Sequence, residues 1–410
     1  MTLRQAAFLR QCFPSAGRSS DYILKEYGTD RFLEQVRQGN LPLFLTEGDR
    51  RHIRRASAGQ ADAMLKSAGE LGQQVIDFSD PRYPELLRQI PGSPILLFCR
   101  GNLALMQKLC ICAVGSRSVS DYGMLAAASL AYQLADAGVC VVSGLARGCD
   151  SAAHRGALMA GGATIAVCGC SLEVSYPAGS EKLREEIAEK GLMISEYPPG
   201  TPVRASSFPV RNRILAGLSR GVLVTEAAQA SGAMITARAA ADMGRDVFTV
   251  PNSIFDPSAR GSIELMKQGA KPVADGGDIL EEYRLLPVYD SLRPERAELP
   301  APIRFDQVAS LRDEQLPPPK SHGAPVRHRK AEHPSEKKPA RQPEKKAPAD
   351  LSALSETARS CYLQLSDVPI ALPELEVILE EKVSALLEAV TELELAGLIR
   401  SLPGRRYIKL

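Results

Sequence analysis

Short apolar runs alternate with longer amphipathic stretches through the middle of the chain, from about residue 72 to residue 285. The amphipathic stretches repeat their apolar positions with helical spacing, whereas the short runs are apolar along their length. The runs that we predict to be strands are QVIDF, ILLFC, CICAV, VCVVS, TIAVC, LMISE, GVLVT and DVFTV. Strands of this kind, separated by helices, indicate a mostly parallel sheet covered on both faces. We therefore expect a doubly wound, Rossmann-like α/β core over residues 71–288.

The chain begins with a different pattern. Residues 1–70 show only helical periodicity, in LRQAAFLRQCF, SDYILKEYG, TDRFLEQVRQ and a stretch that opens with the basic run DRRHIRR. This pattern predicts a small helical N-terminal domain. The arginines of the basic run either contact phosphate or form a solvated helix face, and the second explanation is the commoner one for such runs.

The composition changes sharply after the core. Residues 289–350 are rich in proline and lysine and nearly devoid of large apolar residues, so we expect a disordered linker there. Residues 351–410 then show three amphipathic helices and a hairpin turning at Pro403-Gly404, which is the order of a winged helix. The third helix is acidic and would be repelled by a phosphate-lined groove, which favours a protein-contact or regulatory role. Basic residues in the hairpin are suited to contacts with a DNA backbone. The alternative is therefore a transcription factor that binds duplex DNA through this domain.

The overall composition narrows the class of protein. The chain has 44% hydrophobic and 24% charged residues and a formal net charge of +2, so nucleic-acid binding requires a local basic patch. No apolar run reaches the length of a membrane span, and the first residues lack a signal-peptide pattern, so we expect a cytoplasmic protein. Five of the nine cysteines lie in strand-like apolar runs without the spacing of zinc ligands, which predicts reduced, buried thiols and no metal; they are Cys110, Cys112, Cys140, Cys168 and Cys170.

The loops after the strands carry the candidate site, because ligands of doubly wound sheets bind outside the carboxyl ends of the strands. These loops combine small residues, hydroxyls and arginines, which suit an anion near helix N-termini. The candidate binding residues are Gly115, Ser116, Arg117, Ser143, Gly144, Arg147, Gly148, Phe208, Arg211, Asn212, Arg213, Ser231 and Gly232. Several guanidinium groups at one rim suit successive phosphates, and a phenyl ring offers a platform for an unpaired base. The sequence therefore predicts a site for single-stranded nucleic acid, with Arg204 nearby.

Each of these residues also has a plain structural interpretation. The glycines serve tight strand-to-helix turns, and an acidic residue at a helix start commonly caps it. Either arginine of the RNR run can form an ion pair with Glu196 or Glu226. The residues that we expect to support the site are Asp150, His154 and Glu226. Only the predicted convergence of several loops favours binding over these alternatives.

Enzymatic motifs are missing from the sequence. There is no GxxxxGK[ST] run, and the loop after CICAV lacks the GxGxxG pattern of dinucleotide-binding proteins. Only His52 and His154 lie outside the predicted linker, which leaves no plausible Ser-His-Asp set. We therefore expect neither catalysis nor a cofactor. The alternative is a nucleotide-hydrolysing enzyme of the cytokinin-activating, lysine-decarboxylase-like type with Glu226 as the acid, although its PGGxGT run is replaced by EAAQASGAMIT.

A series of motifs follows one order between about residues 75 and 285. They are VGSRSVSDYG, SGLARGCDSAAHRGAL, TIAVCGCSLEVSYP, ISEYP, FPVRNRILAGLS, EAAQASGAMITARAAADMGRDVFTVP and GSIELMKQGAKPV. In this order they resemble the DprA/Smf family of DNA-processing proteins. Ser171 and Asn252 stand where that family usually has glycine. The resemblance therefore does not determine the loop geometry near Pro251 or the dimer.

The resemblance implies an extended Rossmann-like core that binds single-stranded DNA, between a SAM-like helical N-terminal domain and a winged-helix C-terminal domain. It further implies that the protein displaces single-strand-binding protein and loads the RecA recombinase during natural transformation, without established catalysis. A homodimer and a recombinase contact are implied near the helix that contains Ile263, Leu265 and Met266.

Overall fold

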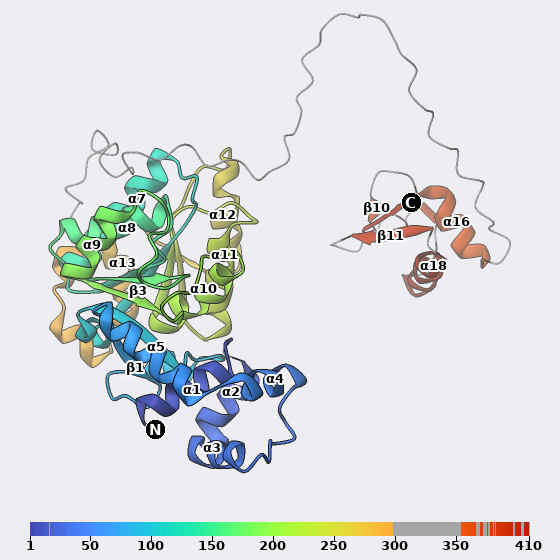
Figure 1. Cartoon of the computed structure of the whole chain (residues 1–410). Helices are drawn as coiled ribbons and strands as arrows, with labels where there is room; N and C mark the ends of the chain where they lie inside the picture. The colour runs from blue at the N-terminus through green and yellow to red at the C-terminus, as the bar shows by residue number, and fades with distance from the viewer. Residues whose placement is uncertain are drawn as a thin grey trace, which may run out of the picture. The chain divides into compact units, whose positions relative to one another are not determined.

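The computed structural model describes most of the chain. Described are residues 1–15, 17–297, 354–365, 370–371, 375, 378–379, 381, 383–396, 398–402 and 406–409. The chain separates into a first unit, Met1–His322, and a second unit, Gly323–Leu410 (Figure 1). Within the described residues, no helix is both long and apolar enough to span a membrane.

The first unit contains a nine-stranded sheet in the order β1-β2-β6-β5-β4-β3-β7-β8-β9, counted over its described residues. The strands are β1 (Gln74–Asp77), β2 (Leu96–Gly101), β3 (Cys110–Val114), β4 (Cys140–Ser143), β5 (Thr164–Cys168), β6 (Leu192–Ser195), β7 (Gly221–Val224), β8 (Asp246–Thr249) and β9 (Lys271–Pro272). β2 pairs antiparallel with β1 and β6, and the other pairs are parallel. Every predicted strand is present. The mostly parallel α/β fold is confirmed, while the two-residue edge strand β9 was not predicted.

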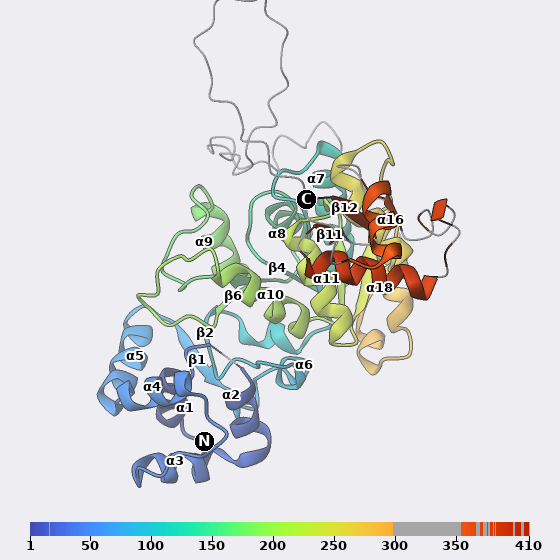
Figure 2. The same cartoon turned by 90° about the vertical axis from the view of Figure 1, so that its right-hand side faces the viewer.

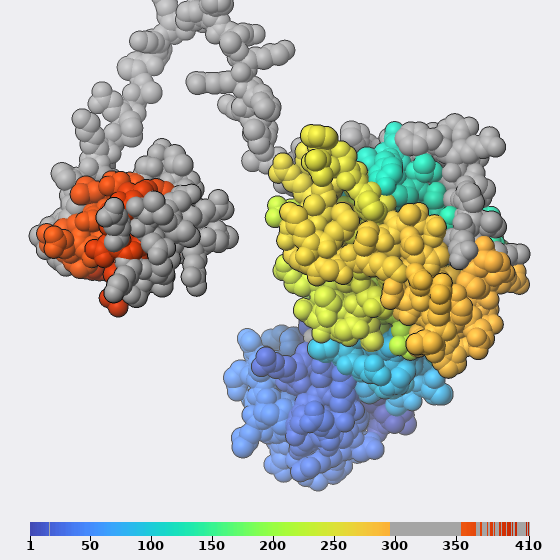
Figure 3. Space-filling model, turned by 180° about the vertical axis from the view of Figure 1, so that it is seen from behind, coloured from blue at the N-terminus to red at the C-terminus, as the bar shows by residue number. Residues whose placement is uncertain are grey.

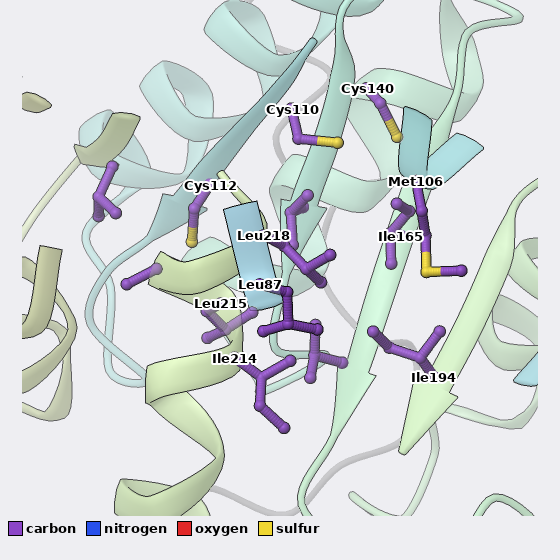
Figure 4. Packing of buried hydrophobic residues seen from close by; sticks show 14 of the residues in the cluster. Leu87, Met106, Cys110, Cys112, Cys140, Ile165, Ile194, Ile214, Leu215 and Leu218 are labelled. Carbon is purple, nitrogen blue, oxygen red and sulfur yellow. The ribbon is translucent and has the colours of Figure 1, made fainter. Parts of the chain in front are cut away.

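Helices cover both faces of this sheet. They are α6 (Glu85–Gln89), α7 (Asp121–Asp136), α8 (Cys149–Met159), α9 (Glu181–Lys190), α10 (Ser207–Leu218), α11 (Gly232–Asp242), α12 (Arg260–Lys267) and α13 (Gly276–Leu280), with the short turns η2 (Leu103–Gln107), η3 (Pro257–Ala259) and η4 (Glu281–Tyr283). β3 divides its side chains between two clusters, as a strand buried on both faces must. Cys110 and Cys112 pack with Ile214 of α10 (Figure 4), whereas Ile111 and Ala113 pack with α7 and α8. All nine cysteines are free and buried, as predicted.

The N-terminal helices pack against one edge of the sheet (Figure 2). They are α1 (Leu3–Cys12), α2 (Arg18–Tyr22), the π-helical η1 (Ile23–Tyr27), α3 (Thr29–Arg37), α4 (Glu47–Arg55) and α5 (Ala58–Glu70). Thr2 and Thr46 begin α1 and α4 with capping boxes, which satisfies the first backbone N–H groups. Phe32 and Ile53 share one buried cluster with Phe98 of β2. A separate domain ending at residue 70 stays a prediction.

The predicted linker does not begin as irregular chain. Short helices η5 (Pro287–Ser291) and α14 (Pro294–Ala297) overlap its first residues, and the Arg293 N–H donates to the Ala137 carbonyl at 2.9 Å. Each helix starts with a proline, whose fixed φ suits the first helical position, so counting proline as a linker residue was misleading here. Residues 298–350 of the predicted linker lie outside the described residues.

In its described residues, the second unit contains α16 (Glu356–Gln364), α18 (Val383–Leu395) and a three-stranded antiparallel sheet in the order β10-β12-β11. Its strands are β10 (Ile370–Ala371), β11 (Ile399–Leu402) and β12 (Arg406–Lys409). The middle predicted helix and the turn at Pro403-Gly404 fall mostly outside the described residues. Glu392 of α18 accepts hydrogen bonds from the Ser355 N–H and hydroxyl at 2.9 and 2.6 Å, so one of the predicted acidic side chains has an internal role.

Candidate nucleic-acid-binding site

The sheet topology creates a crevice between β3 and β7. The chain leaves β3 towards β4 on one side, whereas β7 lies on the other side and is reached from β6 through α10. Ligands of doubly wound sheets bind at such a switch point. A cavity of about 650 Å³ lies here, beside a second of about 430 Å³, and both are lined by Arg117, Ala146, Tyr176 and Phe208. We call the two cavities together the switch-point groove.

The groove brings together most of the predicted binding residues. The larger cavity is lined by Gly115, Ser116, Arg117, Phe208, Arg211, Asn212, Ser231 and Gly232, together with the supporting residue Asp150. The smaller cavity adds Gly144 and Arg147. Ser143, Gly148, Arg213, His154 and Glu226 line neither cavity. The strand-following loops therefore converge as expected, but several of their side chains point elsewhere.

Two aromatic rings form the wall between the cavities. The rings of Phe208 and Tyr176 lie 5.0 Å apart between centroids at 34°, and the exposed Arg117 guanidinium lies 5.7 Å from the Phe208 centroid. Gly169 makes room for this wall, because a Cβ there would lie 2.7 Å from the Phe208 ring. Rings and a stacked guanidinium form a platform on which a base can stack. Tyr176 was not among the predicted residues, although its SYP run directly follows β5 and its loop.

Arg211 is a buried structural residue. It is 3% exposed, and its guanidinium donates to the Gly144 carbonyl at 2.8 Å and to the Val167 carbonyl. A Cβ on Gly144 would lie 2.5 Å from the same guanidinium, so glycine is needed there for this close approach. Burial lowers the pKa of Arg211, and the nearby Asp150 carboxylate opposes that shift. Arg211 therefore ties the ends of β4 and β5 together while also lining the larger cavity, and its predicted contact with DNA stays a prediction.

Arg213 forms an ion pair with Glu196, which is one of the two pairings that the sequence allowed for the RNR run. Its guanidinium donates to the Glu196 carboxylate at 2.6 Å, and the two side chains are 14% and 4% exposed. Arg213 lies two positions after Arg211, about 200° further around the helix, and so faces away from the groove. Arg213 lines neither cavity in this arrangement, and its predicted contact with DNA stays a prediction.

The buried Glu226 carboxylate supports the loop after β3. It is 0% exposed and accepts hydrogen bonds from the Ser120 N–H at 3.0 Å and from the Ser120 hydroxyl. Ser120 in turn caps α7, so Glu226 fixes the segment that carries Ser116 and Arg117. A carboxylate held in this way outside the cavities is poorly placed to protonate a substrate.

The start of α8 depends on a glycine. Gly148 is the cap residue with φ 78°, and a Cβ there would lie 2.3 Å from the Ser116 carbonyl oxygen. Asp150 is therefore not the helix cap. Its carboxylate accepts a hydrogen bond from the Ala146 N–H at 3.3 Å, and burial raises its pKa while Arg211 lowers it. Gly148 and Asp150 therefore fix the conformation of the loop that contains Arg147.

Of the three predicted serines, Ser116 and Ser231 line the larger cavity and Ser143 does not. Ser143 is 0% exposed and donates to the Ala113 carbonyl at 2.6 Å, so it joins two strands and cannot reach a ligand. Ser231 begins α11, lines the larger cavity, and has a hydroxyl without a hydrogen-bond partner within the described part of the chain. This hydroxyl oxygen is buried beside the N-terminus of α11, where backbone N–H groups favour an anion. Ser231 is thus retained as a binding candidate and Ser143 is not.

His154 is buried between α8 and β5. Its Nδ1 lies 2.7 Å from the Thr164 hydroxyl oxygen, and that hydroxyl donates to the Val141 carbonyl at 2.8 Å. Because the hydroxyl proton is already used, Nδ1 must carry the imidazole proton and donate. Nε2 has no hydrogen-bond partner among the residues described, and burial lowers the pKa of His154 to about 3.

This environment predicts a pH-dependent stability. The unfolded chain binds a proton at His154 below its ordinary pKa, whereas the folded chain resists until about pH 3, so stability falls as the pH decreases through this window. Between about pH 7.5 and pH 5, His154 should reduce the free energy of unfolding by about 2 kcal/mol. Denaturant titrations of the unchanged chain and of His154→Gln at several pH values measure this difference. Parallel pH profiles for the two proteins would contradict the assignment.

Comparisons with known proteins agree with this architecture. The family described as "DNA recombination-mediator protein A" matches residues 74–284, and the "DprA winged helix domain" matches residues 345–405. Protein Smf of Synechocystis sp. is 33% identical over 347 residues, covering 84% of this chain and 82% of the relative. DNA processing protein DprA of Streptococcus pneumoniae is 45% identical over 204 residues, covering 50% and 72%. The X-ray structure of DprA from that organism superposes with a TM-score of 0.59 at 33% identity, covering 69% of this chain and 98% of the other.

Proposed function

The chain belongs to the family of DNA recombination-mediator protein A, and we propose that it binds single-stranded DNA in the switch-point groove. The observation that carries this proposal is the wall formed by Phe208 and Tyr176, with the Arg117 guanidinium against the Phe208 ring. A base of the strand can stack on the rings while the neighbouring backbone phosphates lie beside the arginine.

Single strands fit this groove better than duplex. The rings are half-buried between two cavities, so only a base that has left its own stack can enter and lie against them. Arg117 and Arg147 line the smaller cavity, and Ser231 lines the larger one. None of these groups matches the pattern of a particular base edge, so we expect little dependence on DNA sequence.

We propose that binding serves recombination, with the chain displacing single-strand-binding protein and loading RecA in the cytoplasm during natural transformation. A homodimer through α12 is part of this proposal, and Figure 3 shows the segment around α12 in yellow at the surface of the first unit. Leu265 is only 7% exposed and packs in the core, so Ile263 and Met266, which are half-buried, are the remaining candidates for that contact. The second unit then serves as a protein-contact module.

The proposal also assigns no catalytic activity to the chain. The competing nucleotide-hydrolysing enzyme requires an acid at the substrate, whereas Glu226 is buried and bonded to Ser120. Incubation of the purified chain with nucleoside monophosphates should release no free base by liquid chromatography. Steady release that disappears in Glu226→Gln would favour the enzyme instead.

Fluorescence anisotropy with labelled oligonucleotides of about 20 nucleotides tests the binding itself. We expect the single strand to bind at least about tenfold more tightly than the corresponding duplex, and its affinity to fall with salt as phosphate contacts require. Equal affinity for the two forms would contradict the role of the ring platform. RecA filament formation on a strand coated with single-strand-binding protein then tests the proposed loading, which should be faster with the chain present.

A further inference from the structure

One buried residue joins the N-terminal helices to the helix that carries the groove's aromatic ring. Glu196 follows β6 and is 3% exposed. Its carboxylate accepts a hydrogen bond from Arg213 of α10 at 2.6 Å, and its backbone carbonyl accepts one from Arg10 of α1 at 3.3 Å. α1 and α10 are therefore connected through a single residue, which we call, with its two arginines, the Arg10–Glu196–Arg213 bridge.

The charges in this bridge are not balanced. Two guanidinium groups, Arg10 at 6% and Arg213 at 14% exposed, lie at Glu196, and only Arg213 bonds its carboxylate, whereas Arg10 bonds its backbone carbonyl. Burial lowers the pKa of Arg10, the Glu196 charge raises it, and Arg213 lowers it again. One guanidinium nitrogen of Arg213, Nη1, is buried and without a hydrogen-bond partner in the described ranges. Removing either guanidinium therefore changes the electrostatic environment of Glu196 and of the other guanidinium, because buried charges depend on their few partners.

α10 is held at a second point by the same segment. The Tyr197 hydroxyl donates to the carbonyl of Ser207, the first residue of α10, at 3.4 Å. Phe208 is the next residue of the helix, and Arg213 lies one and a half turns further along. A helix of this length moves as a rigid body, so a shift at Arg213 is transmitted to the Phe208 ring.

We infer that the Arg10–Glu196–Arg213 bridge positions α10, so that the N-terminal helices determine how well the groove holds an unpaired base. Arg10 and Arg213 are positioning residues in this arrangement and touch no DNA. The inference rests on the proposed single-strand binding. It gives the N-terminal helices a task in binding although none of them lines the groove.

A double-mutant cycle between the bridge and the ring tests this inference on the full chain. Arg10→Met keeps the aliphatic length of the side chain and removes its guanidinium. We expect it to raise the Kd for single-stranded DNA about fivefold in the otherwise unchanged chain, but less than about twofold in Phe208→Ala, where the ring is already absent. Arg4→Met is the matched control, because Arg4 also lies on α1 but is 62% exposed and paired with Asp62. The control should leave the Kd unchanged.

The salt dependence separates positioning from contact. Arg10→Met should leave the slope of log Kd against log salt unchanged, whereas losing a phosphate contact reduces it by about 0.7. Circular dichroism establishes that each variant is folded, and Glu196→Asp, which retains the charge, replaces Arg10→Met if the latter does not fold. An equal change in Kd in both backgrounds, no change at all, or a reduced slope would each overturn the inference. Failure of the unchanged chain to bind single strands would instead remove the proposed function.

Discussion

Arg211→Met is expected to lower the free energy of unfolding of the first unit by about 3–5 kcal/mol. The guanidinium is buried, and it donates to the carbonyls of Gly144 and Val167 at the ends of two neighbouring strands. Methionine fills a similar volume but leaves both carbonyls without this donor and leaves the Asp150 carboxylate without the guanidinium that most opposes the rise of its pKa. The effect therefore combines lost hydrogen bonds with an uncompensated buried charge.

Urea denaturation followed by circular dichroism measures this difference. Arg204→Met is the control, because Arg204 is exposed and lines neither cavity of the groove, so its replacement should change stability by less than about 0.5 kcal/mol. If Arg211→Met unfolds at the same urea concentration as the unchanged chain, Arg211 is not the structural tie described here. DNA binding by this variant should be compared only under conditions in which it is folded.

Phe208→Ala is expected to weaken single-strand binding by about 1–3 kcal/mol, because each base stacked on an aromatic ring contributes about that much. The loss should be similar for strands of different sequence, since every base has a face that can stack. Arg117→Ala should weaken binding by about 1 kcal/mol and reduce the salt slope by about 0.7, because one phosphate contact is removed. The two variants thus separate the two parts of the platform.

Anisotropy titrations at several salt concentrations give both quantities. Phe208→Tyr keeps the ring and should bind nearly as well as the unchanged chain, and Arg204→Ala should retain the full salt slope. Unaltered affinity in both Phe208→Ala and Arg117→Ala would place the DNA elsewhere on the chain. A sequence-dependent loss in Phe208→Ala would mean that the ring reads a base edge rather than supporting any base.

The fold could be predicted because its strands are buried on both faces. Such strands are apolar throughout, so they stand out against helices with one polar face. The short elements were missed because such a pattern needs several residues to become visible. β9 has two residues, Lys271 and Pro272, and α6 has five, which is too few for a periodic pattern. The helices at the predicted start of the linker were concealed by their own prolines.

The site could be predicted only to the level of its loops. The topology requires the loops after β3, β4 and β7 to meet, whatever their side chains are. The direction of each side chain depends on packing that sequence spacing does not show. Arg211 and Arg213 lie in one short basic run, yet one ties two strands together and the other pairs with Glu196. Tyr176 lies far from Phe208 in sequence, and only the folded loop after β5 brings the rings together.

This difference changes the picture of the binding surface. The sequence suggested a rim of arginines. In the structure, an aromatic wall lies at the centre of the groove, and Arg117 and Arg147 line the groove beside it. Arg211 ties together the strand ends from which the loops of the groove extend. Stacking should therefore contribute more to affinity than charge. A binding site of this kind keeps part of its affinity at high salt.

Photocrosslinking locates the DNA most directly. An oligonucleotide containing iododeoxyuridine is bound to the unchanged chain and irradiated, and the crosslinked peptides are identified by mass spectrometry. We expect crosslinks at Phe208 or Tyr176, which are lost in Phe208→Ala or reduced to Tyr176 alone. Crosslinks confined to the N-terminal helices or to the winged helix, with none in the loops after β5 or at the start of α10, would contradict it.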